Sequence, residues 1–167
     1  MFEIEQKYRI QSPSRIRNLL REWGAKKIRS GAETNELFDF QQVLRSRGSV
    51  LRLRRYGKEK KGLLTFKGPR LKGNYKKRVE IETAVKWKPV RALLKAAGFG
   101  KVADYSKTRE EYAVGKSHIT LDHLKKNGWF VEIEGTSAEI TRLAARLGFS
   151  AKDREERTYL EILNCSL

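Results

Sequence analysis

The chain begins with a segment in which uncharged and charged side chains alternate. The even-numbered positions from 2 to 10 are uncharged, and the positions between them carry Glu3, Glu5, Lys7 and Arg9. A period of two predicts a β-strand, because a strand sends successive side chains to opposite faces. We therefore expect residues 1–10 to form a strand with one fully charged face.

The acidic pair of this strand recurs in two later segments, residues 75–82 and 130–134. Their charged faces carry Lys76, Arg78, Glu80 and Glu82 in the first and Glu132 and Glu134 in the second. A single run of this kind is most often a strand face in water. Three strands that carry the same Glu-x-Glu pair instead indicate a shared site.

Helical periodicity occurs in three other segments, each of which ends at a glycine. These segments span residues 12–24, 89–98 and 140–148, and the first two have a proline in the expected first turn. Their apolar residues recur at helical spacing, which predicts amphipathic helices. A short fourth helix is expected at residues 156–164.

Extended segments between the helices bring the expected total to about eight strands. They lie at residues 26–40, 50–56, 63–67, 101–113, 117–124 and 129–135. Two architectures fit this content. The strands can form an open antiparallel sheet whose charged face meets solvent or RNA, or they can close into a barrel whose charges line the lumen.

The signs of the charges favour the closed barrel. An RNA-binding sheet gains from lysine, arginine and stacking aromatic side chains, whereas glutamates repel phosphate. The expected charged face holds Glu3, Glu5, Glu80, Glu82, Glu132, Glu134, Lys7, Arg9, Arg52, Arg54, Lys67, Lys76 and Arg78. Carboxylates beside cations suit a metal-bound phosphate compound, because hard divalent cations take oxygen ligands and the cations hold phosphoryl oxygens.

The composition also points to an anionic partner. The 167 residues include 37 Lys and Arg against 20 Asp and Glu, a formal charge of +17. This charge predicts attraction to nucleic acid, anionic membrane or polyphosphate, and its sign alone does not choose among them. Nonspecific, salt-sensitive nucleic-acid binding is compatible with it. The length is that of one domain, which we expect to span residues 1–167.

Two absences narrow the class of protein further. A single cysteine, Cys165, excludes an intramolecular disulfide and a cysteine-cluster metal site. No apolar run approaches the roughly 20 residues of a membrane span, and the charged N-terminus is unlike a signal peptide. We therefore expect a soluble cytoplasmic protein with no membrane partner, either a monomer or a homodimer.

Several short motifs follow one another along the chain. They are Glu3-x-Glu5-x-Lys7, Leu37-Phe38-Asp39, Arg52-x-Arg54, Leu64-Thr65-Phe66-Lys67, Arg78-x-Glu80-x-Glu82, Lys107-x-Arg109, Leu121-Asp122 and Glu132-Ile133-Glu134. In this order they resemble the CYTH superfamily, the triphosphate tunnel metalloenzymes, over nearly the whole chain. Leu37 departs from the family pattern, which has tyrosine there. The spacing from Leu121-Asp122 to Glu132 and the Tyr159–Leu163 ending are closest to class IV adenylate cyclase-like proteins.

The resemblance implies an α+β fold, an eight-stranded antiparallel tunnel with a charged lumen and short helices around it. In such a tunnel Mg²⁺ or Mn²⁺ would be held by carboxylates, here Glu3, Glu5, Glu132, Glu134 and Asp122. The substrate would be bound by cations, here Lys7, Arg52, Arg54, Lys67, Lys76, Arg78, Lys107 and Arg109. The residues implied to be catalytic are Glu3, Glu5, Lys7, Lys107 and Arg109.

Other polar residues of the chain have an alternative structural interpretation. Glu80 and Glu82 are either metal ligands or internal partners of Arg52 or Arg78. His118 and His123 are not expected to be metal ligands, because carboxylates already supply the oxygen ligands that Mg²⁺ prefers. The sequence therefore predicts a carboxylate site without histidine.

The sequence leaves two reactions open. A cyclase presents the α-phosphorus to the ribose 3′-oxygen, whereas a hydrolase presents the terminal phosphorus to water. The resemblance favours the cyclase, which converts ATP to cyclic AMP and pyrophosphate. Hydrolysis of tripolyphosphate or thiamine triphosphate is the alternative, and a non-catalytic module that binds RNA or polyphosphate is a more distant one.

Overall fold

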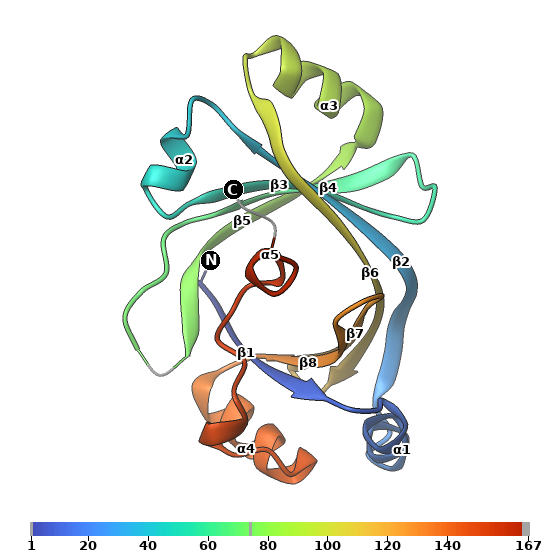
Figure 1. Ribbon diagram of the computed structural model, residues 1–167. Coiled ribbons are helices and arrows are strands. Elements are labelled where there is room, and N and C mark those ends of the chain that lie inside the picture. The colour runs from blue at the N-terminus through green and yellow to red at the C-terminus, as the bar shows by residue number, and fades with distance from the viewer. Residues whose placement is uncertain (1, 74, 165–167) are drawn as a thin grey trace.

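Eight antiparallel strands close into a barrel in the computed structural model, which describes residues 2–73 and 75–164 (Figure 1). Around the barrel the strand order is β1-β5-β4-β3-β2-β6-β7-β8. The strands are β1 (Phe2–Ile10), β2 (Lys26–Asp39), β3 (Val50–Tyr56), β4 (Lys61–Lys67), β5 (Lys76–Lys86), β6 (Gly100–Val114), β7 (Ser117–Leu124) and β8 (Gly128–Glu134). The predicted closed barrel is confirmed, and the open sheet is excluded.

Short helices surround the barrel, as predicted, and one of them lies inside the ring of strands. Those outside the ring include α1 (Ser14–Glu22), α3 (Trp87–Ala96) and α4 (Ser137–Leu147), whereas α5 (Tyr159–Ile162) lies within it (Figure 1). The structure adds α2 (Val43–Ser46) and a 3₁₀ turn (Ala151–Asp153), and α5 is shorter than predicted. One-turn elements escape periodicity because they contain too few residues to show a period.

The main hydrophobic core lies outside the barrel, between its wall and two helices. Alternation along β7 and β8 sends Ile119, Val131 and Ile133 outward, where they are fully buried. They pack in one cluster with apolar residues of α1 and α4, including Leu20 and Leu143. Because the apolar faces point outward under the helices, the charged faces are left to line the lumen.

A second hydrophobic cluster lies under α3. Two element boundaries predicted for this part of the chain are wrong. β5 continues to Lys86, four residues beyond the predicted end, because Lys61 to Leu64 of β4 keep pairing with it. α3 begins at Trp87, two residues before Pro89. A proline is tolerated within the first helical turn, since the amide groups there have no partner inside the helix.

Two further observations concern membrane spans and the residues that the structure describes. No helix in the described part of the chain has both the length and the apolar character needed to cross a bilayer. Met1, the first residue of a predicted strand, and Cys165 lie outside the described residues.

Candidate functional site

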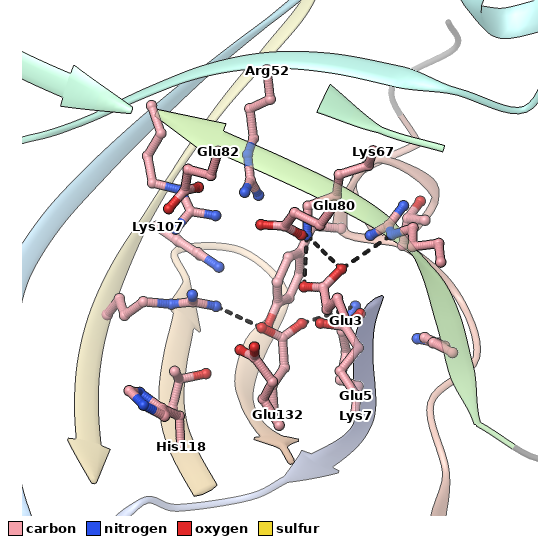
Figure 2. Close-up of a pocket in the computed structure, with 18 of the residues that line it drawn as sticks. Glu3, Glu5, Lys7, Arg52, Lys67, Glu80, Glu82, Lys107, His118 and Glu132 are labelled. Atoms are coloured by element: carbon pink, nitrogen blue, oxygen red, sulfur yellow. Dashed lines mark hydrogen bonds and ion pairs between the residues drawn. The ribbon is translucent and has the colours of Figure 1, made fainter. Parts of the chain in front are cut away.

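A cavity of about 310 Å³ occupies the lumen, and most of its lining side chains are charged (Figure 2). All but one of the predicted site residues line it. They are Glu3, Glu5, Lys7, Arg52, Arg54, Lys67, Lys76, Arg78, Lys107, Arg109, Glu132 and Glu134. The exception is Asp122, which is fully buried and binds Lys107 and Arg109, two residues of the lining. The structure therefore brings together side chains that are far apart in the sequence.

Strand β1 brings predicted carboxylates and cations to the same level of the lumen. Glu3 lies opposite Arg78 of β5. Glu5 lies between Lys76 of β5 and Glu134 of β8. Because the side chains of each strand alternate, all five line the cavity.

The Glu3 carboxylate is held by two cations from neighbouring strands. Lys67 Nζ donates to its two oxygens at 2.7 and 2.8 Å, and Arg78 Nε donates to one of them at 3.2 Å. Charge-assisted hydrogen bonds are the strong ones, and these side chains are largely shielded from water. This part of the wall is therefore preorganised.

Glu80 and Glu82, whose roles the sequence left open, both have partners in the wall. Glu80 pairs with Lys67 at 2.5 Å, and Glu82 accepts a hydrogen bond from Thr65 Oγ1 at 2.6 Å. Burial raises the pKa of Glu80, but Lys67 and hydrogen bonds outweigh burial and hold the pKa below its usual value. Glu80 thus forms an internal ion pair with Lys67, and the charge of Arg52 also lowers its pKa.

A deeper network centres on Asp122 of β7. Lys107 Nζ donates to this carboxylate at 3.0 Å, and Arg109 donates through Nε at 2.7 Å and Nη2 at 2.5 Å. Arg109 Nη2 also bonds Glu132 at 2.5 Å. Asp122 therefore fixes two of the predicted substrate-binding cations, while its role as a metal ligand stays a prediction.

Glu33 of β2 belongs to the same network, although the sequence analysis did not single it out. Its carboxylate lies 3.6 Å from Lys107, 3.7 Å from Arg54 and 3.8 Å from Arg109. Burial would raise the pKa of Glu33, but these three cations hold it well below its usual value. The signal for this residue was its place in the segment 26–40, where alternation puts Glu33 and Asn35 on one face.

Glu111 and His118 also line the cavity. The sequence analysis did not name Glu111, and it named His118 only as a residue not expected to bind metal. Nδ1 of His118 lies 3.1 Å from Glu111 Oε1, and His118, labelled in Figure 2, is four residues from Asp122 along β7. Neither residue belongs to a Glu-x-Glu or Lys-x-Arg motif, so the sequence offered no specific signal for them.

Arg52 of β3 presents donor atoms that no described residue of the chain satisfies. Its guanidinium points into the cavity (Figure 2), and its buried Nε and Nη2 have no hydrogen-bond partner among the described residues. Buried polar groups are nearly always paired, because an unsatisfied one is costly. The cavity is therefore suited to an anionic ligand whose oxygens accept from Arg52.

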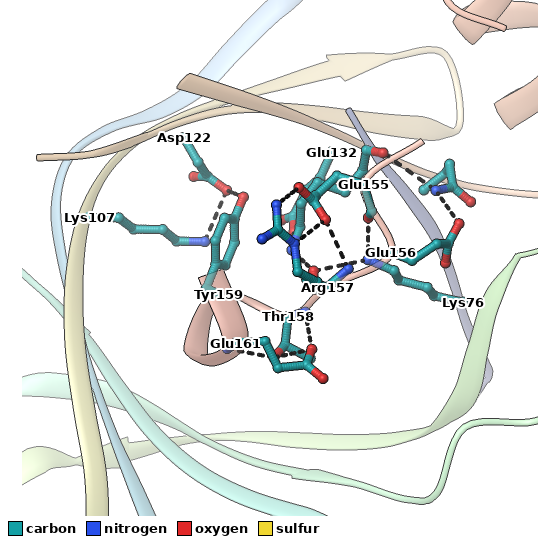
Figure 3. A network of polar contacts seen from close by, with 12 residues as sticks. Lys76, Lys107, Asp122, Glu132, Glu155, Glu156, Arg157, Thr158, Tyr159 and Glu161 are labelled. Carbon is teal, nitrogen blue, oxygen red and sulfur yellow. Dashed lines mark hydrogen bonds and ion pairs between the residues drawn. The ribbon is translucent and has the colours of Figure 1, made fainter. Parts of the chain in front are cut away.

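Two lysines at the end of the cavity near α5 already bind oxygen atoms of the C-terminal backbone, and one of them, Lys76, is labelled in Figure 3. Lys7 Nζ donates to the carbonyl of Arg157 at 2.9 Å, and Lys76 Nζ donates to that of Glu155 at 2.8 Å. Burial, and after it the charge of Lys7, lowers the pKa of Lys76 to about 8. An anion near these lysines would relieve their repulsion.

The carboxylates of β1 and β8 fit a divalent cation by their chemistry. Burial, followed by the charges of Glu3, Glu5 and Glu80, raises the pKa of Glu134 to about 7. A divalent cation would relieve this repulsion, and carboxylate oxygens are the ligands that Mg²⁺ takes. Among the described residues, no group of three or more His, Cys, Asp or Glu is gathered around one point as a metal site. The donor chemistry therefore fits, while Glu3 and Glu132 are held by lysine and arginine.

In the metal-free protein, we expect Glu134→Gln to raise stability more at about pH 8 than at about pH 5. The folded pKa of about 7 lies above the usual value of 4.5, so the folded state binds a proton that the unfolded state releases. Stability from this group is present below about pH 4.5 and is lost as the pH rises through 7. Melting curves across this range test the prediction, with the exposed Glu22→Gln as control. An equal gain at both pH values would contradict it.

Comparisons with known proteins agree with this geometry. A profile of the CYTH domain matches residues 1–159. The chain is 27% identical over 165 residues to a putative adenylate cyclase of Methanocaldococcus jannaschii, covering 98% of this chain and 88% of that protein. It is 28% identical to the adenylate cyclase CyaB of Aeromonas hydrophila, covering 99% and 91%. The crystal structure of a putative adenylate cyclase from Vibrio parahaemolyticus superposes with a TM-score of 0.88 at 27% identity, covering 98% of each chain.

Proposed function

Because the chain belongs to the CYTH domain family, we propose that it is a divalent-metal-dependent enzyme that binds a triphosphate in the lumen of its barrel. Proteins of this family process triphosphates and use divalent metals. The lumen supplies both requirements, carboxylates for a cation and a dense set of lysines and arginines for phosphoryl oxygens.

The observation that carries this proposal is the unsatisfied guanidinium of Arg52. A surface cation can be solvated, but Arg52 is only 9% exposed, and its buried Nε and Nη2 have no partner in the part of the chain that the structure describes. A phosphate group supplies acceptor oxygens in the geometry that a guanidinium prefers. Net positive charge alone would not require such buried, unpaired donors.

Under this proposal the cations of the lumen bind the substrate, and the carboxylates hold the metal. Arg52, Arg54, Lys67 and Arg78 hold the phosphates, and Lys107 and Arg109 orient the substrate. Mg²⁺ or Mn²⁺ held by Glu3, Glu5, Glu132 and Glu134 would neutralise phosphoryl charge and activate the nucleophile. Lys7 and Lys76 bind the inner end of the phosphate chain. The fixed cations stabilise the negative charge that develops on the leaving group during the reaction.

The reaction that we favour is the conversion of ATP to cyclic AMP and pyrophosphate. The ribose 3′-oxygen attacks the α-phosphorus and loses its proton to a base, and the bond to the bridging oxygen of the leaving pyrophosphate breaks. Support comes from the relatives, which are named adenylate cyclases and align over nearly the whole chain at 27% and 28% identity. Under this proposal the lumen cations bind the departing pyrophosphate.

One feature of the cavity favours a second candidate, the hydrolysis of tripolyphosphate. No aliphatic side chain of the described residues lines the cavity, and its aromatic lining consists of Tyr105 and Tyr159. A nucleobase site is usually lined by apolar and aromatic groups. The cavity volume, about 310 Å³, is also at the lower end of the usual range for small-molecule sites. These properties suit a bare phosphate chain.

Product identification separates the two reactions. The protein is incubated with ATP, tripolyphosphate or thiamine triphosphate, each with Mg²⁺ or Mn²⁺, and the products are analysed by chromatography and ³¹P NMR. We expect cyclic AMP and pyrophosphate from ATP. Orthophosphate from tripolyphosphate without cyclic AMP from ATP would replace the cyclase by the hydrolase, and no product from any triphosphate would overturn the enzyme assignment.

A further inference from the structure

The C-terminal segment enters the ring of strands (Figure 1), and its Thr158 and Tyr159, which are labelled in Figure 3, line the cavity. Tyr159 and Ile162 of α5 pack with Leu124 and Phe130 of the barrel wall. Thr158 caps this short helix, because its hydroxyl accepts a hydrogen bond from the backbone amide of Glu161. The segment is therefore anchored by apolar packing and by a capping box, although it has only one helical turn.

Tyr159 makes three contacts with the charged network of the lumen. Its hydroxyl donates to Asp122 Oδ2 at 2.6 Å. Its ring centre lies 3.8 Å from Lys7 Nζ and 4.3 Å from Lys107 Nζ. Burial and the charges of Asp122 and Glu132 raise the pKa of the phenol well above its usual value, so the hydroxyl stays protonated and remains a donor.

These contacts hold two lysines that would otherwise repel each other. A lysine ammonium near the face of a desolvated aromatic ring is attracted by the ring quadrupole. The hydroxyl acts on Lys107 indirectly, because Asp122 binds Tyr159 and Lys107 through the same oxygen, Oδ2. One aromatic side chain thus contacts both ammonium groups, in addition to the Arg157 carbonyl that binds Lys7 and the Asp122 carboxylate that binds Lys107.

The ring is also part of the surface that a ligand would meet. Tyr159 and Thr158 line the cavity, and the side chain of Tyr159 packs edge-on against Phe130 with ring centres 5.7 Å apart. Behind the ring lies packed apolar structure that includes Leu124. A phosphate chain that enters from the other end must therefore stop at Tyr159.

We propose that Tyr159 is a positioning residue that fixes Lys7 and Lys107 at the inner end of the cavity and limits the length of the phosphate chain that the cavity accepts. The proposal rests on the triphosphate-binding function and specifies how the site measures its substrate. It assigns a role to the Tyr159–Leu163 ending, which the function proposed above does not use.

Binding of phosphate chains of increasing length tests this inference. Affinities for pyrophosphate, tripolyphosphate and tetrapolyphosphate are measured by calorimetry, without added metal and again with Mg²⁺, for the full chain and for Tyr159→Phe, Tyr159→Leu and Tyr159→Ala. The control is Ile162→Val, which trims the packing of the same helix and leaves the lysine contacts in place. Thermal melts establish which variants are folded, and Tyr159→Leu preserves apolar packing if the alanine variant is unfolded.

We expect the full chain to prefer tripolyphosphate to tetrapolyphosphate. Tyr159→Leu and Tyr159→Ala should shift the ratio of these two affinities at least about tenfold toward the longer chain, because the ring no longer closes the cavity. Tyr159→Phe keeps the ring, so it should keep the ratio and lose affinity for all chains by about tenfold. Ile162→Val should keep both the ratio and the affinities.

The outcomes separate this inference from the function on which it rests. An unchanged ratio in folded Tyr159→Leu would overturn the role of the ring, and a Tyr159→Phe variant that shifts the ratio as strongly as leucine would also overturn it. In either case tight tripolyphosphate binding by the full chain would leave the proposed function intact. Failure of the full chain to bind any phosphate chain would instead overturn the proposed function itself.

Discussion

Replacing Glu5 by alanine is expected to lower metal-dependent turnover at least about a hundredfold, because a bound metal supplies several kcal/mol of transition-state stabilisation. Glu5 lines the cavity opposite Lys76 and Glu134. Its charge is one cause of the raised pKa of Glu134. Removing Glu5 therefore relieves repulsion in the metal-free protein, and we expect no loss of thermal stability. Steady-state kinetics and melting curves measure the two effects separately.

A matched control removes one negative charge at a position outside the lumen. Glu36→Ala removes a carboxylate that pairs with Arg91 of α3 outside the barrel, so turnover should persist. Both variants remove one negative charge, so the net positive charge of the chain rises equally. If RNA binding depends on net charge alone, both variants should bind RNA at least as well as the original chain. Retained metal-dependent turnover in Glu5→Ala would contradict the metalloenzyme assignment and favour the nucleic-acid-binding alternative.

The barrel strands were predictable because charged and uncharged residues alternate along them in the sequence. In β1 and in residues 76–82 of β5 every second residue is charged, so the set of residues that share a face follows from the period alone. Closure followed from a different property, the mixture of glutamates with lysines and arginines on that face. A closed lumen is the arrangement in which such side chains can surround one anion and its cation.

The pairing of particular charges could not be predicted, because it depends on register between strands that are distant in the sequence. Lys67 binds Glu3 and Glu80, for example, and these three residues come from β4, β1 and β5. Glu33 was missed because it belongs to no repeated motif, and its complete burial arises only when β2 faces β3 and β6. Sequence alternation gives the face of a residue and does not give its neighbours.

Tyr159 shows a second limit of sequence reasoning. Its ending was singled out by resemblance, but the position of α5 inside the ring depends on the path of the chain after α4. A helix of four residues has no amphipathic pattern that would indicate what it packs against. The contacts of Tyr159 with Lys7, Lys107 and Asp122 therefore emerge only in three dimensions.

Neutralising Asp122 is expected to destabilise the fold strongly. Asp122 is fully buried and binds Lys107, Arg109 and Tyr159. In Asp122→Asn the two cations lose their central counter-ion, and breaking a buried pair in this way typically costs about 3–5 kcal/mol. For a chain of this length we expect the melting temperature to fall by roughly 10 °C, measured by calorimetry.

The second variant for this test removes the stranded charge as well. Lys107→Met in the Asp122→Asn background should recover part of the lost stability, because an unpaired buried charge costs more than an apolar side chain at the same place. The melts are run with and without Mg²⁺, since the two roles of Asp122 differ there. An ion-pair centre destabilises the metal-free protein when it is lost, whereas a metal ligand destabilises only the metal-bound form. If the melting temperature of Asp122→Asn falls only when Mg²⁺ is present, Asp122 is a metal ligand. This result would contradict its role as the counter-ion of Lys107 and Arg109.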